Sequence, residues 1–394
     1  MLTSADVDRE RQGEAKGLAR IRHRLLALEM GLGGAVLLVL LLSGIAERLR
    51  DWVVGLTSQP VLIVAIYFCV VWAGYGLIML PMGYYGSFRL PHRYGLSTQT
   101  LRGWLVDEVK SALLGVGLGL VVVEVIYYLL RVTPEVWWLV AGGFMVALTV
   151  VLANLAPVIL VPLFYKLEPV ADEGLVTRLE CLAARAGTSV RGVYTMNLSS
   201  RTKAANAMIM GLGNTRRIVL GDTLYGDYGP DEIETILAHE LAHHVRHDMW
   251  WGLLVQSGLT LAGFYVVHLA LSWGKVAVGL QGLDDVAGLP LVGLVMGLFL
   301  GVTTPLGNGF SRWRERMADE YALRMTGKPE AFISAMVRLA NQNLADVDPE
   351  RWVELLLHSH PALGKRIARG ERFLRESGEG LALEADVGPG RAAG

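Results

Sequence analysis

The stretch PDEIETILAHELAHHVRHD, residues 230–248, contains the pattern HELAH from His239 to His243. At about 3.6 residues per turn, the two histidines lie one turn apart on the same face of a helix, where both imidazoles can reach one zinc ion. Glu240 lies next to that face and is placed to act as a general base toward a water molecule. The stretch predicts a zinc-binding helix, and the alternative is a surface helix with two unrelated histidines.

The flanking residues favour a helix over this stretch. Pro230 suits the first helical turn because its φ is fixed, and the acids that follow it complement the positive end of the helix dipole. His244 and His247 lie beside the pattern, but His244 points about 100° away from His243 around the helix, since successive residues are related by 360°/3.6. We expect both to be structural or exposed, not ligands.

A catalytic zinc needs a third protein ligand and one open position. Position 249 is methionine, so the third histidine of the metzincin pattern is absent. The segment SRWRERMAD, residues 311–319, instead offers Glu315 and Asp319 one helical turn apart. We predict Glu315 as the third ligand and Asp319 as a carboxylate that accepts the outer N–H of a ligating imidazole. The alternative for this segment is a helix with solvated charges.

The composition points to a membrane protein. The chain has 394 residues, of which 53% are hydrophobic and 19% charged, more apolar than an ordinary soluble enzyme. Its formal net charge of -1 gives no basic field for nucleic acid, so no nucleic-acid partner is predicted. The two cysteines, Cys69 and Cys181, exclude a cysteine-based metal cluster.

Six stretches are long and apolar enough to cross a bilayer as helices, which takes about 20 residues each. They cover residues 25–45, 61–82, 111–130, 137–160, 251–273 and 289–309. The first follows a basic segment without an evident cleavage site, so it is expected to be a retained anchor. Basic residues before the first span and in the 86–110 loop place both on the cytoplasmic side, and the polar blocks 165–248 and 311 onward then face the same side.

The predicted fold is a membrane α-helical bundle of about six transmembrane helices with a mostly helical, zincin-type catalytic domain that contains a small β-sheet. A helix is predicted over 171–186 and strands over 190–198 and 217–220. Glu124 and His268 fall within spans, where the functional hypothesis competes with a polar side chain facing the bundle interior.

The domain prediction follows from these elements. It comprises a cytoplasmic N-terminal segment (1–24), transmembrane helices 1–4 (25–164), a catalytic part with the zinc-binding helix (165–250), transmembrane helices 5–6 (251–310), a catalytic part with the third ligand (311–376) and a disordered tail (377–394).

Several further segments resemble the type 1 CAAX prenyl protease family, which includes the HtpX heat-shock proteases. They are YGLS (94–97), Asp107 and Lys110, PLFYKLEP (162–169), RTKAANA (201–207), RIVLGDTL (217–224), the HELAH and Glu315 helices, and His360-Pro361 with Arg366-Ile367. The resemblance covers residues 90–370, and so many ordered matches are more specific than the zinc pattern alone.

The resemblance implies His239, His243 and Glu315 as ligands of one zinc ion, Glu240 as the base and Asp319 as its supporting carboxylate. It also implies site residues that the pattern alone does not indicate. Asn206 and Ala207 match the family's substrate-facing strand edge, where an extended peptide can be held by main-chain hydrogen bonds. His360 matches a histidine that stabilises the developing oxyanion, with a helix-capping role as the alternative, and Arg366 is expected to orient the Glu315 or Asp319 carboxylate.

Two features depart from the family. Eukaryotic members have seven spans around an intramembrane chamber, whereas six are predicted here, one fewer before Tyr94. The family's aspartate ahead of the Ser-Arg segment is not evident, because Asn197 and Leu198 occupy that part of the sequence.

The predicted function is therefore a zinc metalloendopeptidase of a bacterial cell membrane, with its site on the cytoplasmic side and a peptide or membrane-protein segment, prenylated or not, as substrate. One alternative is an HtpX-like quality-control protease of membrane proteins. Another is a non-catalytic membrane scaffold or transporter with structural zinc, against which Glu240 argues because a structural site needs no base.

Overall fold

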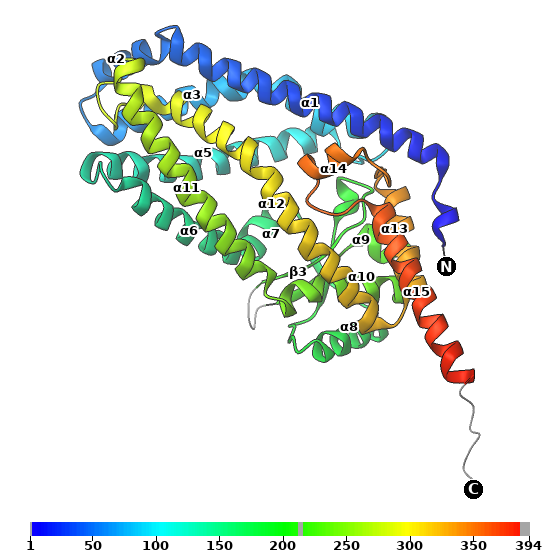
Figure 1. The fold of residues 1–394 in the computed structure, drawn as a ribbon. Helices are drawn as coiled ribbons and strands as arrows, with labels where there is room; N and C mark the ends of the chain where they lie inside the picture. The colour runs from blue at the N-terminus through cyan, green and yellow to red at the C-terminus, as the bar shows by residue number, and fades with distance from the viewer. Residues whose placement is uncertain (1, 212–215, 387–394) are drawn as a thin grey trace. The chain divides into compact units, whose positions relative to one another are not determined.

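The computed structural model describes residues 2–211 and 216–386 (Figure 1). The chain divides into two compact units, each assembled from separate stretches. The first unit comprises Met1–Ala19, Pro157–Met249 and Gly307–Gly394, and the second comprises Arg20–Ala156 and Trp250–Leu306.

Long apolar helices dominate the second unit. In chain order the helices that belong to it, wholly or in part, are α1 (Arg9–Leu42), α2 (Ile45–Leu56), α3 (Pro60–Gly83), α4 (Leu90–Arg93), α5 (Leu101–Val132), α6 (Trp137–Leu155), α11 (Asp248–Ala277) and α12 (Leu289–Thr326). A π-helical turn, Tyr84–Arg89, joins α3 to α4, and a second one, Ala156–Leu160, leads from α6 into α7 (Val161–Phe164) in the first unit.

Six helices of the described residues are long and apolar enough to cross a membrane, which confirms the predicted number and order of spans. They run over Arg9–Leu42, Pro60–Arg93, Leu101–Val132, Trp137–Phe164, Asp248–Ala277 and Val286–Thr326. Each is longer than its predicted apolar core, and most of them continue through polar flanking residues at one or both ends. Large apolar side chains such as Leu77, Leu298 and Val302 are at least 70% exposed on these helices, as expected for lipid-facing positions.

A few polar contacts fix the interior of the second unit. His268 accepts a hydrogen bond at Nδ1 from Trp137 Nε1 (3.0 Å), so this intramembrane histidine faces the bundle interior and has a structural partner. Arg50 pairs with the buried carboxylate of Asp285 at 2.8 Å. One carboxylate oxygen of Glu124 is buried without a hydrogen-bond partner among the described residues.

The first unit contains a mixed four-stranded sheet in the order β1-β2-β4-β3. The strands are β1 (Leu167–Pro169), β2 (Val193–Met196), β3 (Ala207–Met210) and β4 (Arg217–Gly221). β2 and β4 are parallel, whereas β1 and β3 run antiparallel to their neighbours. β3 is thus an edge strand, with Ala207 opposite Leu220 of β4.

Helices surround this sheet. They are α8 (Glu173–Arg185), α9 (Asp222–Asp227), α10 (Pro230–Val245), α13 (Pro329–Gln342), α14 (Arg351–Leu357) and α15 (Leu363–Asp386). α10 packs against α8, β3 and α13, and α13 lies beside α15 (Figure 1). Leu179, Ile218, Leu237 and Phe332, each fully buried, join these elements in one apolar core.

Helix α10 begins as the sequence predicts. Pro230 occupies its first turn, and the Glu232 carboxylate accepts a hydrogen bond from the Gly229 N–H (2.8 Å). The helix ends at Val245, and His247 adopts a left-handed backbone conformation with φ of 54°, which turns the chain sharply before α11 begins at Asp248.

Both ends of the described chain are part of the first unit. Residues near the N-terminus dock on α13, where the Leu2 N–H donates to Ser334 Oγ (2.9 Å) and the Asp8 N–H to Asn341 Oδ1 (3.1 Å). The disorder predicted for 377–394 is wrong for its first part, because α15 continues to Asp386 through a run rich in leucine, alanine and glutamate, which favour helix. Residues 387–394 lie outside the described part of the chain.

Candidate metal centre and active site

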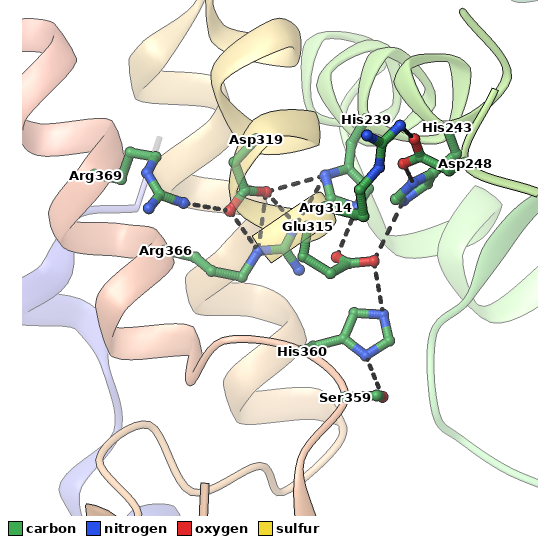
Figure 2. A network of polar contacts seen from close by, with 10 residues as sticks. All are labelled: His239, His243, Asp248, Arg314, Glu315, Asp319, Ser359, His360, Arg366 and Arg369. Carbon is green, nitrogen blue, oxygen red and sulfur yellow. Dashed lines mark hydrogen bonds and ion pairs between the residues drawn. The ribbon is translucent and has the colours of Figure 1, made fainter. Parts of the chain in front are cut away.

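Three side chains from two helices converge on one point in the first unit. His239 and His243 project from α10, and Glu315 projects from α12 toward both rings (Figure 2). The Nε2 atoms of His239 and His243 lie 3.2 and 3.3 Å from the two carboxylate oxygens of Glu315. One donor atom from each residue lies within 4.8 Å of the other two, a spacing that allows all three to hold one metal ion.

Each histidine is oriented from behind by an aspartate. His239 Nδ1 lies 3.0 Å from Oδ1 of Asp319, and His243 Nδ1 lies 2.8 Å from Oδ2 of Asp248. An imidazole that donates Nδ1–H to a carboxylate presents the lone pair of Nε2 on the opposite side of the ring. Both rings are therefore held with a basic nitrogen facing the same point.

Each aspartate is in turn paired with arginine. Asp319 is fully buried and pairs with Arg366 at 2.6 Å and with Arg369 at 3.2 Å. Asp248 forms an ion pair with Arg314. The two imidazoles thus have equivalent supporting contacts: the Nδ1 atom of each ring contacts an aspartate carboxylate, and that carboxylate is paired with an arginine guanidinium (Figure 2).

The donor set fits a divalent cation. Oε2 of Glu315 is buried without a hydrogen-bond partner of good geometry among the described residues, although His239 Nε2 lies 3.2 Å away. Burial lowers the pKa of the His239 and His243 imidazoles, but the surrounding carboxylates, Glu315 foremost at His243, outweigh it and raise both pKa values. Two imidazole nitrogens and one carboxylate, with room for a fourth ligand, are the donor set of many catalytic zinc sites.

Glu240 adjoins these ligands on α10 and is half-buried. Burial raises the pKa of its carboxyl group, while His239 and His243 oppose that shift. It lines a cavity of about 440 Å³ whose wall also includes the two predicted strand-edge residues, Asn206 and Ala207. The predicted base and the predicted substrate edge therefore face the same space.

His360 reaches the centre from the loop that follows α14. Its Nε2 atom lies 3.3 Å from Oε1 of Glu315, and its Nδ1 atom lies 2.9 Å from Ser359 Oγ. The side chain is 60% exposed and lines the same cavity. All of the predicted site residues therefore lie in the first unit, either around the Glu315 carboxylate and its partners or in the wall of the cavity.

The histidines beside the pattern lie apart from the ligand group. The pKa of His244 is lowered to about 4 by burial and by the nearby charge of Arg216. His247 occupies the left-handed turn after α10. Neither belongs to the group of donor atoms around Glu315.

Comparison with known proteins places this arrangement in a family. A family model described as peptidase family M48 matches residues 169–372, and one described as the CAAX prenyl protease N-terminal region, with five membrane helices, matches residues 4–166. The chain belongs to peptidase family M48. It is therefore a multi-pass membrane metalloprotease that acts on peptide substrates, and the family implies a bound metal.

Individual M48 relatives agree with this assignment. An uncharacterized metalloprotease of Bacillus subtilis, YhfN, is 30% identical over 362 residues, which cover 91% of this chain and 85% of the relative. A probable CAAX prenyl protease 1 of Schizosaccharomyces pombe is 27% identical over 74% of this chain and 62% of its own length. The crystal structure of S. mikatae Ste24p has the same fold, with a TM-score of 0.83 and 22% identity over 93% of this chain and 90% of that one.

One difference from the M48 description concerns the N-terminal region. The matching family model has five membrane helices, whereas residues 4–166 of this chain contain four helices of spanning length and the shorter α2. The resemblance to the CAAX prenyl protease family is confirmed.

Two site residues of this M48 peptidase were not predicted. Asp248 follows the zinc-binding helix and Arg314 precedes the third predicted ligand, so both are adjacent in sequence to residues that were recognised. The sequence could have indicated Asp248 as an acidic residue five positions after His243. On a continuous helix, however, its side chain would point away from the His243 ring. The turn at His247 brings it back.

Proposed function

We propose that this chain is a zinc-dependent endopeptidase in which His239, His243 and Glu315 hold the metal and Glu240 is the general base. The observation that supports this most strongly is the convergence of both Nε2 atoms on the Glu315 carboxylate beside a cavity that contains Glu240. When bound, zinc supplies the Lewis acidity that lets water attack a carbonyl at neutral pH.

The protein's own groups account for the remaining steps. Glu240 takes the proton of the attacking water and later passes it to the leaving amine, since its raised pKa favours a group that can both accept and return a proton. His360 faces the same space and donates a hydrogen bond to the oxyanion that develops on the carbonyl oxygen. The outer edge of β3 at Ala207, beside Asn206 in the wall of the cavity, holds the substrate backbone in an extended conformation.

The substrate class follows from the relatives' printed names. Since several are CAAX prenyl proteases, we propose a prenylated C-terminal peptide as the first substrate class to test. An HtpX-like role in degrading damaged membrane proteins is the second, and it requires the same catalytic groups.

The membrane orientation is a further part of the proposal. The basic N-terminal segment and the basic loop 86–110 favour a cytoplasmic location for both, and with six spans the catalytic segments share that side. A bacterial cell membrane is the proposed host.

The test compares purified wild type with Glu240→Gln and with Glu320→Gln. Glu320 lies on the same helix as Glu315 but is 54% exposed and pairs with Arg324, so it controls for loss of a carboxylate. Zinc content, cleavage of a quenched fluorescent peptide library and cleavage of a farnesylated CAAX peptide are measured for all three.

We expect about one zinc per chain in each protein and loss of cleavage by a factor of at least about 10³ in Glu240→Gln alone. Preference for the farnesylated peptide over its unmodified form supports the prenylated class, and equal cleavage of both supports the quality-control class. Bound zinc with no cleavage by the wild type would favour the non-catalytic scaffold.

A further inference from the structure

The outer edge of β3 can be followed residue by residue. The Gly221 N–H donates to the Asn206 carbonyl (2.8 Å), so the polar groups of Asn206 face β4. Because backbone groups alternate in direction along a strand, those of Ala205 and Ala207 face the opposite, outer side. That outer side has no strand partner in the sheet.

A side chain already occupies the outer position at Ala205. The Ala205 N–H donates to Oδ1 of Asn343 (2.9 Å), and Nδ2 of Asn343 donates to the Ala205 carbonyl (3.2 Å). One carboxamide therefore makes both hydrogen bonds that a residue of an adjacent strand would make. A peptide added to this edge cannot pair with Ala205 while Asn343 is there.

The turn at the end of α13 positions the Asn343 carboxamide. Asn343 follows the last residue of the helix, and Leu344 has a left-handed backbone with φ of 47°, an uncommon conformation for a leucine. The Ala345 N–H then closes the turn on the Ala340 carbonyl (3.0 Å), and the Leu344 side chain is 3% exposed. Asn343 and Ala345 both line the cavity that contains Glu240.

The edge is open at Ala207. Ala207 lines the cavity that contains Glu240, and its N–H and carbonyl face the same outer side as those of Ala205. No hydrogen bond to these two groups is formed on that side within residues 2–211 and 216–386. Pairing of a peptide with this edge can therefore begin only after Ala205, at Ala207.

We propose that Asn343 is a positioning residue that ends the substrate strand at Ala207 and so fixes which peptide bond reaches Glu240. The inference rests on the proposed peptidase function and deepens it. A strand can slip by two residues without changing the face on which its side chains lie, and a slip by one residue is prevented because it reverses that face. With Ala205 occupied, a strand shifted by two residues finds no pairing partner at Ala205, so the paired segment stops at Ala207.

The test uses Asn343→Ala with Asn341→Ala as its matched control. Asn341 lies two residues earlier and makes an equivalent pair of backbone contacts, accepting from the Asp8 N–H (3.1 Å) and donating to the Asp6 carbonyl (3.1 Å). Each protein is incubated with a peptide that the wild type cuts at one bond, and mass spectrometry gives the cleavage positions.

For Asn343→Ala we expect a second cleavage two residues from the first and a lower KM, because Ala205 becomes free to pair with the peptide, with kcat within about twofold of wild type. Asn343→Asp, which keeps the oxygen that accepts from Ala205, is expected to suppress part of the second cleavage. Asn341→Ala is expected to match the wild type. A single cleavage site with an unchanged KM in Asn343→Ala would overturn the proposal while leaving the peptidase function intact.

A readout that does not depend on activity accompanies these assays. Hydrogen–deuterium exchange of the metal-loaded protein should be faster over residues 204–207 in Asn343→Ala and unchanged there in Asn341→Ala. Unchanged exchange in Asn343→Ala would also overturn the proposal, including in the event that the wild type cuts no peptide.

Discussion

The Nδ1 atom of His243 lies 2.8 Å from Oδ2 of Asp248, although the two residues lie on different helices separated by a sharp turn. The opposite ring, His239, has the equivalent contact with Asp319 at 3.0 Å. Each imidazole is thereby fixed in one orientation before any metal binds. Orienting contacts of this kind commonly contribute a factor of 10–100 to metal affinity.

Replacement of Asp248 by asparagine should weaken metal binding. The amide keeps the shape of the carboxylate but removes its charge, so we expect zinc affinity to fall by about 10–100-fold. Competition with a chelator of known affinity measures the change, with Glu320→Gln as the control. Unchanged affinity in Asp248→Asn would show that the Asp248 contact does not orient the His243 ring for the metal.

The two arginines on Asp319 should differ in their effect on stability. Arg366 is 9% exposed and makes three hydrogen bonds to Asp319, so Arg366→Met leaves a buried carboxylate largely uncompensated and should cost about 3–5 kcal/mol. Arg369 is 29% exposed with a single 3.2 Å contact, and Arg369→Met should cost about 1 kcal/mol or less. Thermal unfolding in detergent compares them, and equal losses would contradict this ranking.

Replacement of His360 by alanine should reduce catalysis without affecting stability. The side chain is 60% exposed, so its loss leaves no buried cavity, but it removes the proposed donor to the oxyanion. We expect kcat to fall by about 10²–10³-fold, with zinc content and unfolding temperature as in the wild type. Ser359→Ala, which removes only the contact to His360 Nδ1, should have a much smaller effect. A fall in KM alone would point to another role for His360.

A charged network between α8, α10 and the residue before α13 should make stability depend on pH. Lys328 and Arg178 both contact Asp231 and Glu234. The hydrogen bonds from Lys328 and Arg178 hold the pKa of Asp231 below its ordinary value, and at Glu234 they lower the pKa although burial opposes them.

Carboxyl groups with lowered pKa stabilise the folded state above their unfolded pKa, and this contribution is lost as the pH falls through the folded pKa. Lys328→Met should therefore lower stability by about 1 kcal/mol at pH 7, a modest value because Lys328 and Asp231 are partly exposed. The difference from the wild type should begin to shrink as the pH falls below about 4 and should disappear only below the lowered folded pKa values of Asp231 and Glu234. A difference that persists in acid would indicate that packing of the lysine, not its charge, is responsible.

The sequence predicted the membrane spans and indicated the candidate metal-binding group because both depend on short-range periodicity. Twenty apolar residues in a row have few alternatives to a spanning helix, and residues four apart on a helix share a face wherever the helix lies. The pattern from His239 to His243 and the pair Glu315 and Asp319 could therefore be assigned without knowledge of the fold. Their convergence required two helices to meet, which the sequence suggested through the need of a catalytic zinc for a third ligand and through the family resemblance.

The C-terminal segment 377–394 and Asp248 are two places where the local sequence pattern did not predict the structure. Glycines near residues 378 and 380 favoured disorder, yet the helix-forming residues that follow let α15 continue to Asp386. Asp248 was not predicted; on a continuous helix it would point away from His243, and the left-handed backbone of His247 brings it to that ring.

The sequence by itself determined the class of protein, the number of spans and the residues that bear the proposed chemistry, because these follow from composition and from spacing within single helices. Only the tertiary structure decided which side chains orient those residues and where a bound peptide can pair. Asn343 reaches Ala205 across 138 positions of the chain, and no periodicity encodes a contact between segments so far apart. Such contacts exist because packing of the apolar core brings the segments together.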